Sequence, residues 1–147
     1  MKFYLDVWCL NRPFDDQTQI RVHLEAEAVI AIIGQVENEA WQWISSDAVA
    51  YEISKTPNEE RQERLWSMES SATTRMELTD SILSKASKFK QLGFTTYDAL
   101  HLVFAIEANV DTFLSTDDKL LRRARRYSEE IPISVANPLS WLQKVTL

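Results

Sequence analysis

The sequence predicts an α/β fold, a three-layer α/β/α sandwich with a mostly parallel central sheet. Short apolar stretches that suit buried strands alternate along the chain with longer stretches of helical periodicity. The length of 147 residues corresponds to about one ordinary domain, so we expect residues 1–147 to form a single domain. The apolar fraction of 45% and the charged fraction of 26% are typical of globular proteins and exclude wholesale disorder.

Local patterns predict the elements of the first half of the chain. Phe3, Tyr4 and Leu5 are consecutive large residues, as in a strand that is buried on both faces of a parallel sheet. After a turn-rich segment, apolar residues recur every three or four positions, which indicates one face of a helix. The predicted elements are a strand at 2–6, a loop at 11–16, a helix from Gln17 to about Asn38, an aromatic strand at 41–45 and a helix from Asp47 to about Lys55, capped by Ser46.

Capping and turn residues place the elements of the second half. The segment 56–59, Thr-Pro-Asn-Glu, matches a capping box with proline at the first helical position, so we expect a helix to begin there. Gly93 is typical of the residue that follows the end of a helix. The remaining predicted elements are a strand at 75–78, a helix from Thr79 or Asp80 to Gly93, a helix from Thr95, a strand at 111–115, a basic helix at 119–126, a strand at 133–135 and a terminal helix from Pro138.

The composition excludes several classes of protein. Only two glycines occur, so a glycine-rich phosphate-binding loop is excluded. The single cysteine, Cys9, excludes an internal disulfide and fits a reducing compartment. No apolar run approaches the roughly 20 residues of a membrane-spanning helix, and Asp6 stands where a signal peptide would need apolar residues. We therefore expect a soluble, cytoplasmic protein with no membrane partner.

Acidic residues follow the predicted strands at the edge where parallel sheets bind their ligands. Several carboxylates gathered at one place repel each other unless some are protonated or cations lie between them. Oxygen ligands suit Mg²⁺ or Mn²⁺, and two such ions roughly 4 Å apart would activate a water and stabilise the leaving oxygen of a phosphodiester. The candidate residues are Asp6, Glu52, Asp98, Asp117 and Asp118.

The net charge of −6 bears on the same question. Taken alone it argues against a nucleic-acid partner, because contacts to phosphate need lysine and arginine. Carboxylates that hold divalent cations change this conclusion, since the loaded site is far less negative than the residue count suggests. The acidic composition therefore weakens a nuclease hypothesis without excluding it.

Each of these acids also has an ordinary structural explanation. Asp98 and Asp118 both stand three residues after a threonine or serine, which is the spacing of a capping box, and an acid in the first turn stabilises a helix by about 0.3–1 kcal/mol. Glu52 alone suits a solvated helix face. Asp6 is harder to explain, because an acid that closes a buried apolar strand costs free energy unless it is paired or coordinated. The combination of acids favours a metal site.

Four segments, in their order along the chain, resemble the motifs of a PIN domain. They are Tyr4-Leu5-Asp6, Ser45-Ser46 leading to Tyr51-Glu52-Ile53, Asp98-Ala99-Leu100-His101-Leu102, and Leu114-Ser115-Thr116-Asp117-Asp118-Lys119. The resemblance covers nearly the whole chain and is strongest to the bacterial single-domain group that includes the VapC toxins. It implies a Rossmann-like sandwich and a Mg²⁺- or Mn²⁺-dependent endoribonuclease that hydrolyses RNA phosphodiester bonds. A small antitoxin protein and a homodimer are implied as partners.

The resemblance also implies roles for particular residues. The catalytic acids would be Asp6, Glu52, Asp98 and Asp118, and the metal ligands would be Asp6 and Asp98 with Asp117 or Asp118. The hydroxyl of Thr116 would support the fourth acid. In the loop after the first acid, Asn11 and Arg12 are candidates for substrate contact, since arginine matches the geometry of phosphate.

One departure from the family leaves other functions open. Val7-Trp8-Cys9 follows the first acid, where a small polar residue is common in PIN domains. A catalytically weak or inactive PIN-fold module that binds or regulates is therefore the alternative function. A phosphatase with Asp6 as its nucleophile is disfavoured, because no second aspartate stands two residues later.

Three further features have two interpretations each. Cys9 suits a small buried thiol better than a nucleophile, since no basic residue is evident to lower its pKa. His101 suits a packed or hydrogen-bonded helix residue, and a supporting role near the acids is the other option. The cluster from Arg122 to Arg126 suits either a solvated helix face or contacts to an RNA backbone.

Overall fold

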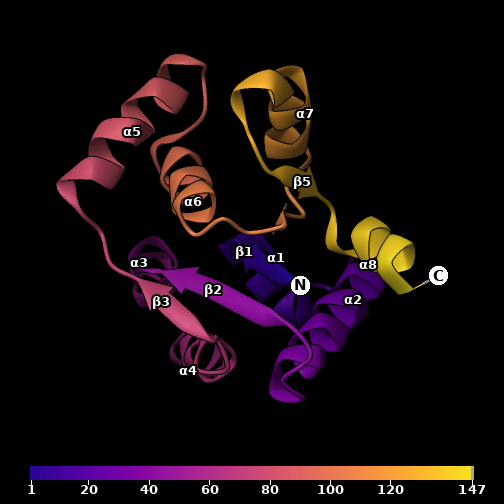
Figure 1. The fold of residues 1–147 in the computed structure, drawn as a ribbon. Coiled ribbons are helices and arrows are strands. Elements are labelled where there is room, and N and C mark those ends of the chain that lie inside the picture. Colours follow the sequence, from indigo (N-terminus) through magenta and orange to yellow (C-terminus); the bar gives the residue numbers. More distant parts are fainter. Residues whose placement is uncertain (147) are drawn as a thin grey trace.

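The computed structural model describes residues 1–146 and contains a five-stranded parallel sheet with helices on both of its sides (Figure 1). The strands are β1 (Lys2–Leu5), β2 (Gln42–Ser46), β3 (Thr74–Met76), β4 (Thr112–Leu114) and β5 (Ser134–Ala136). The α-helices are α1 (Val7–Asn11), α2 (Ile20–Glu37), α3 (Asp47–Ser54), α4 (Glu59–Glu69), α5 (Asp80–Gln91), α6 (Thr96–Glu107), α7 (Asp118–Arg126) and α8 (Pro138–Thr146). Two short 3₁₀ helices are η1 (Arg12–Phe14) and η2 (Ser128–Glu130). The predicted α/β sandwich with a parallel sheet is confirmed.

The strand order β3-β2-β1-β4-β5 places β1 at the centre of the sheet. The chain builds outward from β1 through β2 to β3, and then returns to the other side of β1 for β4 and β5. This reversal creates a topological switch point between β1 and β4, where sheets of this kind form a crevice beyond the carboxyl ends of the strands. The backbone N–H of Asp6 donates to the carbonyl of Leu114 at 3.2 Å, so the first residue after β1 meets the last residue of β4 there.

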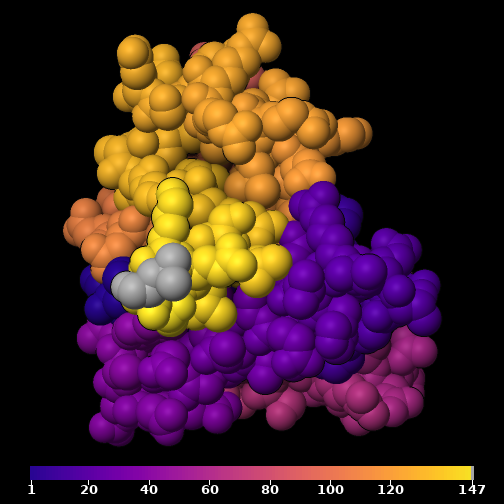
Figure 2. All heavy atoms as spheres, turned by 90° about the vertical axis from the view of Figure 1, so that its right-hand side faces the viewer, coloured from indigo at the N-terminus to yellow at the C-terminus, as the bar shows by residue number. Residues whose placement is uncertain are grey.

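The core explains why β1 carries three large residues in succession. Phe3, Tyr4 and Leu5 are fully buried, since helices cover both faces of the central strand. In Figure 1, α5, α6 and α7 lie on one side of the sheet, and α2 and α4 lie on the other. Figure 2 shows α8, in yellow, resting against the violet segment that contains α2, and the two helices are in contact.

The segment directly after β1 differs from the prediction. Residues 7–11 form the short helix α1, and a 3₁₀ turn replaces the first part of the expected loop at 11–16. The apolar run Val7-Trp8-Cys9-Leu10 carries no strand or helix periodicity of its own that would reveal this. Asp6 ends the strand and caps the helix, because its side chain accepts the backbone N–H of Cys9.

Side chains cap most of the other helices, whereas α2 follows Gln19 and has no side-chain cap. Ser46, Thr79 and Thr95 each accept a backbone N–H three residues later, as predicted. The predicted capping box at 56–59 is wrong, because Asn58 is the capping residue and α4 begins at Glu59. Among the described residues, no helix is both long enough and apolar enough to cross a membrane.

Candidate active site

Four of the five candidate acids stand on elements that converge at the switch point of the sheet. Asp6 follows β1, Glu52 lies on α3, Asp98 is in the first turn of α6, and Asp117 caps α7 directly after β4. Their charges influence each other: the charge of Asp98 raises the pKa of Asp6, and the charges of Asp117 and Glu52 raise the pKa of Asp98. These carboxyl groups therefore share one electrostatic environment.

Asp6 is the most deeply buried of these acids, with only 1% of its surface exposed. One carboxylate oxygen, Oδ1, accepts the backbone N–H of Cys9 at 3.0 Å. The other oxygen, Oδ2, is buried and has no hydrogen-bond partner among the residues that the structure describes. Burial raises the pKa of Asp6 to about 7, although the neighbouring Ser115 hydroxyl, the Cys9 N–H and the charge of His101 act in the opposite direction.

Asp98 is held at the start of α6 by the helix that it helps to begin. Its backbone N–H donates to the Thr95 hydroxyl at 3.2 Å, which fixes the first turn of the helix. Partial burial raises the pKa of Asp98, and the charges of Asp117 and Glu52 add to this effect. The predicted cap is therefore real, but Thr95 is the capping residue. The charge of His101 and a side-chain hydrogen bond to Thr95 lower the pKa of Asp98 and so oppose the effect of burial.

A chain of buried hydrogen bonds holds Glu52. His101 bonds to Glu52 through Nε2 and to the Tyr4 hydroxyl through Nδ1, the second contact at 2.5 Å. The Tyr4 hydroxyl also contacts the Ser46 hydroxyl at 2.7 Å. His101 is therefore the hydrogen-bonded helix residue that the sequence favoured, and it fixes the orientation of Glu52, which is partly exposed beside it.

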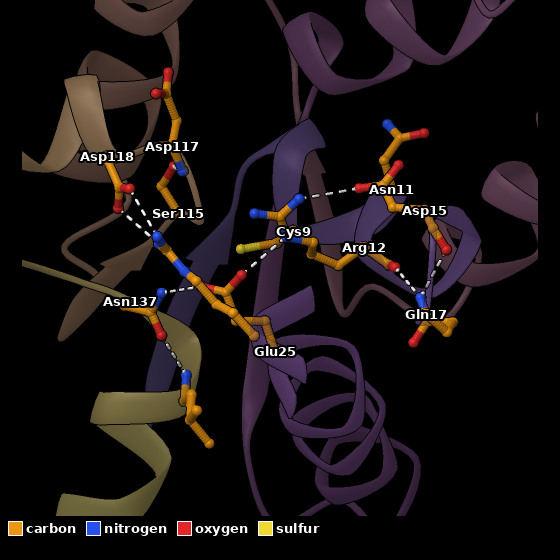
Figure 3. Close-up of polar contacts among 12 residues, drawn as sticks. Cys9, Asn11, Arg12, Asp15, Gln17, Glu25, Ser115, Asp117, Asp118 and Asn137 are labelled. Atoms are coloured by element: carbon orange, nitrogen blue, oxygen red, sulfur yellow. Dashed lines mark hydrogen bonds and ion pairs between the residues drawn. The ribbon is translucent and has the colours of Figure 1, made fainter. Parts of the chain in front are cut away.

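The two adjacent aspartates after β4 have different environments. Asp118 forms a bidentate ion pair with Arg21, at 2.7 and 2.8 Å. Hydrogen bonding to Arg21 also lowers the pKa of Asp118. In Figure 3 the carboxylate of Asp118 turns toward this guanidinium group, whereas the carboxylate of Asp117 points away from it. Asp117 caps α7 by accepting the backbone N–H of Lys119 at 3.0 Å. Of the two, Asp117 is the residue whose charge acts on Asp98.

The hydroxyl groups of Ser115 and Thr116, which follow β4, also have different environments. Ser115, fully buried, accepts the backbone N–H of Asp117 at 3.0 Å and lies beside Asp6. The hydroxyl of Thr116 is buried and has no hydrogen-bond partner within residues 1–146. Ser115 therefore supports both Asp6 and Asp117 in this structure, which is the role that the resemblance implied for Thr116.

A surface hollow of about 400 Å³ opens beside Glu52. Trp8, Asn11 and Arg61 line it, and Trp8 has 53% of its surface exposed. Arg61 donates to the Asn11 side chain at 2.9 Å and to Asp15 at 2.6 Å. Arg12 is held elsewhere by Glu25 and Asp15, and it does not line the hollow.

The donor atoms at the switch point suit a hard divalent cation, since they are carboxylate and hydroxyl oxygens. The unpartnered Oδ2 of Asp6 is the observation that fits best, because a buried carboxylate oxygen without a donor needs a cation or a proton. Within residues 1–146, however, no three His, Cys, Asp or Glu side chains already stand close enough to hold a metal ion. Binding a cation would therefore require carboxylates to turn toward Asp6.

Sequence reasoning missed three residues at this site. Arg61 and Arg21 come from α4 and α2, and nothing in their local sequence indicates that they reach Asn11 and Asp118 across the fold. In the sequence, Ser115 stands out only by its capping-box spacing to Asp118 and as part of the segment 114–119. Its position directly before Thr116 and Asp117, at the end of a buried strand, is the signal that could have identified it.

The fold and the site together define a class of protein. A parallel α/β sandwich with acidic residues around its switch point suits a hydrolase that acts on phosphate esters with divalent cations. The family model of the PIN domain matches residues 18–126, and the chain belongs to this family, whose members are generally nucleases. The match includes Glu52, Asp98 and Asp117, and Asp6 lies before it.

Solved structures share the fold. The crystal structure of PAE2754 from Pyrobaculum aerophilum has a TM-score of 0.57 and 14% identity, covering 99% of this chain and 90% of that chain. The crystal structure of VapBC2 from Rickettsia felis, bound to a DNA fragment from their promoter, has a TM-score of 0.57 and 18% identity, covering 93% of this chain and 98% of that chain. A comparison with curated proteins finds no match.

Proposed function

We propose that this protein is a Mg²⁺- or Mn²⁺-dependent endoribonuclease that hydrolyses RNA phosphodiester bonds. The observation that carries the proposal is the buried, unpartnered Oδ2 of Asp6 at the switch point, with further acids around it that raise the pKa of Asp6 and Asp98. Four acids that repel each other are stabilised together when divalent cations lie between them. Membership of the PIN domain family supports the same chemistry.

In this proposal the carboxylates of Asp6, Asp98 and Asp117 hold the cation, and Glu52 completes the site. A bound Mg²⁺ or Mn²⁺ would supply Lewis acidity toward the phosphate and lower the pKa of an attacking water. The chain's own residues fix the geometry. The Tyr4–His101 pair orients Glu52, which would accept a proton from water, and Ser115 holds the turn that carries Asp117.

The hollow beside Glu52 is the proposed path of the substrate strand. Trp8 offers an exposed aromatic face, and stacking on such a face contributes about 1–3 kcal/mol for each base. Asn11 and Arg61 line the same hollow and supply hydrogen-bonding groups. Asn11 thus stays a candidate for substrate contact, and Arg61 takes the role that we expected for Arg12.

We extend the proposal to partners and location. The neighbour from Rickettsia felis is a VapBC pair, which supports a small antitoxin protein as the partner of this chain. An antitoxin segment that covered the hollow at Trp8 and Glu52 would block the proposed path of RNA. A homodimer and a cytoplasmic location complete the proposal.

A second candidate function rests on a specific observation. Glu52 is bonded to His101, Asp118 is bonded to Arg21, and no ready cluster of three metal-binding side chains exists within residues 1–146. A PIN-fold module that binds or regulates without catalysis would have these features. Calorimetric titration with Mn²⁺ separates the two functions, because only the nuclease is expected to bind the cation.

Cleavage of a labelled single-stranded RNA in Mn²⁺ tests the proposal. We expect Asp98→Asn and Asp117→Asn to abolish cleavage, and EDTA to abolish it in the wild type. Asp111→Asn is the matched control, because Asp111 precedes β4 at the opposite edge of the sheet and is exposed. Asp118→Asn should keep most of the activity, since Asp118 is paired with Arg21. Cleavage that survives in Asp98→Asn and in EDTA would reject the proposal.

A further inference from the structure

The helix α7 concentrates positive charge on an acidic protein. Five of its nine residues are cationic, in a chain whose net charge is −6. All five are exposed, and none forms an ion pair with another residue described by the structure. These residues are Lys119, Arg122, Arg123, Arg125 and Arg126.

Four of these cations face the same way. Lys119, Arg122, Arg123 and Arg126 have the spacing of one helix face, and together they line a surface hollow of about 420 Å³ that contains no acidic residue. We call this surface the α7 basic face. Figure 2 shows the orange side chains of this part of the chain standing out at the top of the molecule. The surface is therefore open to a large ligand.

The helix α7 begins at one of the acids of the proposed site. Asp117, a residue of the proposed metal site, caps α7, and Lys119 stands two residues further along the chain. From Lys119 to Arg126 the helix rises by roughly 10 Å, a length that spans more than one phosphate of a nucleic-acid strand. The α7 basic face therefore begins at the proposed site and leads away from it.

Helix electrostatics alone do not account for this arrangement. Cations in the last turn do stabilise a helix through its dipole, which explains Arg125 and Arg126. Lys119 is in the first turn, where the same effect is unfavourable. Like charges three or four residues apart also repel each other. A bound polyanion would offset this repulsion.

One of the four cations is held in place by neighbouring backbone. The Arg123 guanidinium donates to the carbonyl of Leu92 at 3.3 Å. Gly93 makes room for it, since a Cβ atom at this position would lie 2.2 Å from Arg123 Nη1. Arg122 and Arg126 have no such bond within residues 1–146, so their guanidinium groups are free to bind phosphate.

We propose that the α7 basic face binds the sugar-phosphate backbone of the substrate RNA, beside the phosphate that is cut. This inference rests on the proposed function and adds a substrate-binding surface to it. Recognition of this kind depends on charge and is independent of base sequence. It resolves the conflict between the acidic composition and an RNA substrate, because the required cations are gathered on one helix.

The test measures binding to a fluorescently labelled single-stranded RNA in EDTA, over a series of KCl concentrations. Arg122→Gln/Arg126→Gln removes two cations of the α7 basic face. Lys88→Gln/Lys144→Gln removes two exposed cations from α5 and α8 and is the control of equal charge. Each lost phosphate contact should reduce the slope of log Kd against log[KCl] by about 0.7, so we expect a reduction of about 1.4 and a weakening of binding by roughly tenfold at 0.1 M KCl. The control should keep the slope of the wild type.

Two outcomes would overturn the inference. A reduction of the slope by the same amount in both double variants would show that RNA binding depends only on the net charge of the protein. Tighter binding of polyglutamate than of RNA at the same salt, lost in Arg122→Gln/Arg126→Gln, would assign the surface to an acidic protein segment. Failure of the proposed function is distinguishable, because the binding assay needs no cleavage. A wild-type protein that binds with the expected slope but never cuts RNA in Mn²⁺ would support this inference and reject the nuclease.

Discussion

At the scale of single residues, Asp6 combines two roles that compete with each other. It caps α1 through Oδ1, and it keeps Oδ2 buried without a partner in the described structure. Capping stabilises the fold, whereas an unpaired buried charge destabilises it. Proteins tolerate such a residue where the same unpaired group binds a ligand, and the proposed cation is that ligand.

The pKa of Asp6 predicts how its substitution changes stability. Because burial raises this pKa to about 7, the folded state binds more protons than the unfolded state between about pH 4 and pH 7. Stability due to this group is therefore lost as the pH rises through that range. Asp6→Asn keeps an oxygen for the Cys9 N–H and removes the charge, so we expect it to stabilise the protein in EDTA at pH 8 by up to about 4 kcal/mol.

Urea denaturation at several pH values measures this effect. The difference in unfolding free energy between Asp6→Asn and wild type should shrink toward zero near pH 4. Adding Mn²⁺ at pH 8 should stabilise the wild type and leave Asp6→Asn unchanged, since only the carboxylate binds the cation. An Asp6→Asn protein that is less stable than wild type at pH 8 in EDTA would contradict the interpretation.

The candidate site could be predicted from sequence only as far as strand ends can be located. Asp6 and Asp117 follow from that rule, because parallel strands present their carboxyl ends at one edge. Asp98 does not, since α6 comes after the helix α5, and Asp98 is a candidate because it stands at the start of a helix and in a family motif. The pairing of Asp118 with Arg21 and of Glu52 with His101 could not be predicted, since each joins helices that are far apart in the chain. Such pairs depend on how the helices pack and leave no trace in local sequence.

At the scale of elements, boundaries follow the sequence wherever a cap or a glycine fixes them. Ser46 and Thr79 precede the first residues of α3 and α5. Their side chains accept hydrogen bonds from backbone N–H groups that have no partner within the helix. The helix α1 escaped prediction, because its capping residue also ends a strand. It has only five residues, so its stability comes from packing and from Asp6 rather than from its own periodicity.

Substitution of alanine for each of the two glycines is expected to change stability in opposite directions. Gly93 has a φ of 102°, and an added Cβ would meet Arg123. We expect Gly93→Ala to destabilise the protein by about 1–3 kcal/mol, from backbone strain and from displacement of that side chain. Gly34 lies inside α2 with no heavy atom within 4 Å of an added Cβ. Gly34→Ala should therefore stabilise the protein by about 0.4–1 kcal/mol.

Thermal unfolding of the two variants measures these changes side by side. A Gly93→Ala protein as stable as Gly34→Ala would show that the turn after α5 adapts without strain. The same pair also bears on the α7 basic face, because only Gly93→Ala moves Arg123 away from Leu92. RNA binding should therefore change in Gly93→Ala alone.

At the scale of the whole molecule, a buried charge network joins the two ends of the chain. Glu25 on α2 is almost fully buried and accepts hydrogen bonds from Arg12 at 2.9 Å, from Arg21 at 3.3 Å and from Asn137 at 2.5 Å (Figure 3). Asn137 also accepts the backbone N–H of Leu139 at the start of α8. One carboxylate therefore connects η1, α2 and the terminal helix.

The same network reaches the proposed site through Arg21, which bonds to both Glu25 and Asp118. Arg21 thus holds Asp118 away from Asp117 while its own position is set by Glu25. This link could not be predicted from local sequence, because a glutamate within an amphipathic helix is ordinarily solvated. Its burial follows only from the packing of α8 against α2, which is a property of the complete fold.

Neutralising Glu25 should therefore weaken the molecule as a whole. We expect Glu25→Gln to lower the unfolding free energy by about 1–3 kcal/mol, because it removes one of the two charged partners of the partly buried Arg12 and adds a donor opposite Asn137. Glu27→Gln, on the exposed face of the same helix, should cost less than about 0.5 kcal/mol. Urea denaturation measures both, and hydrogen exchange should show α8 losing protection first in Glu25→Gln. Equal stability of the two variants would show that the packing of α8 on α2 needs no charge network. The terminal helix would then be held by apolar packing, which includes the contacts of Trp141 with Phe3 and Trp41.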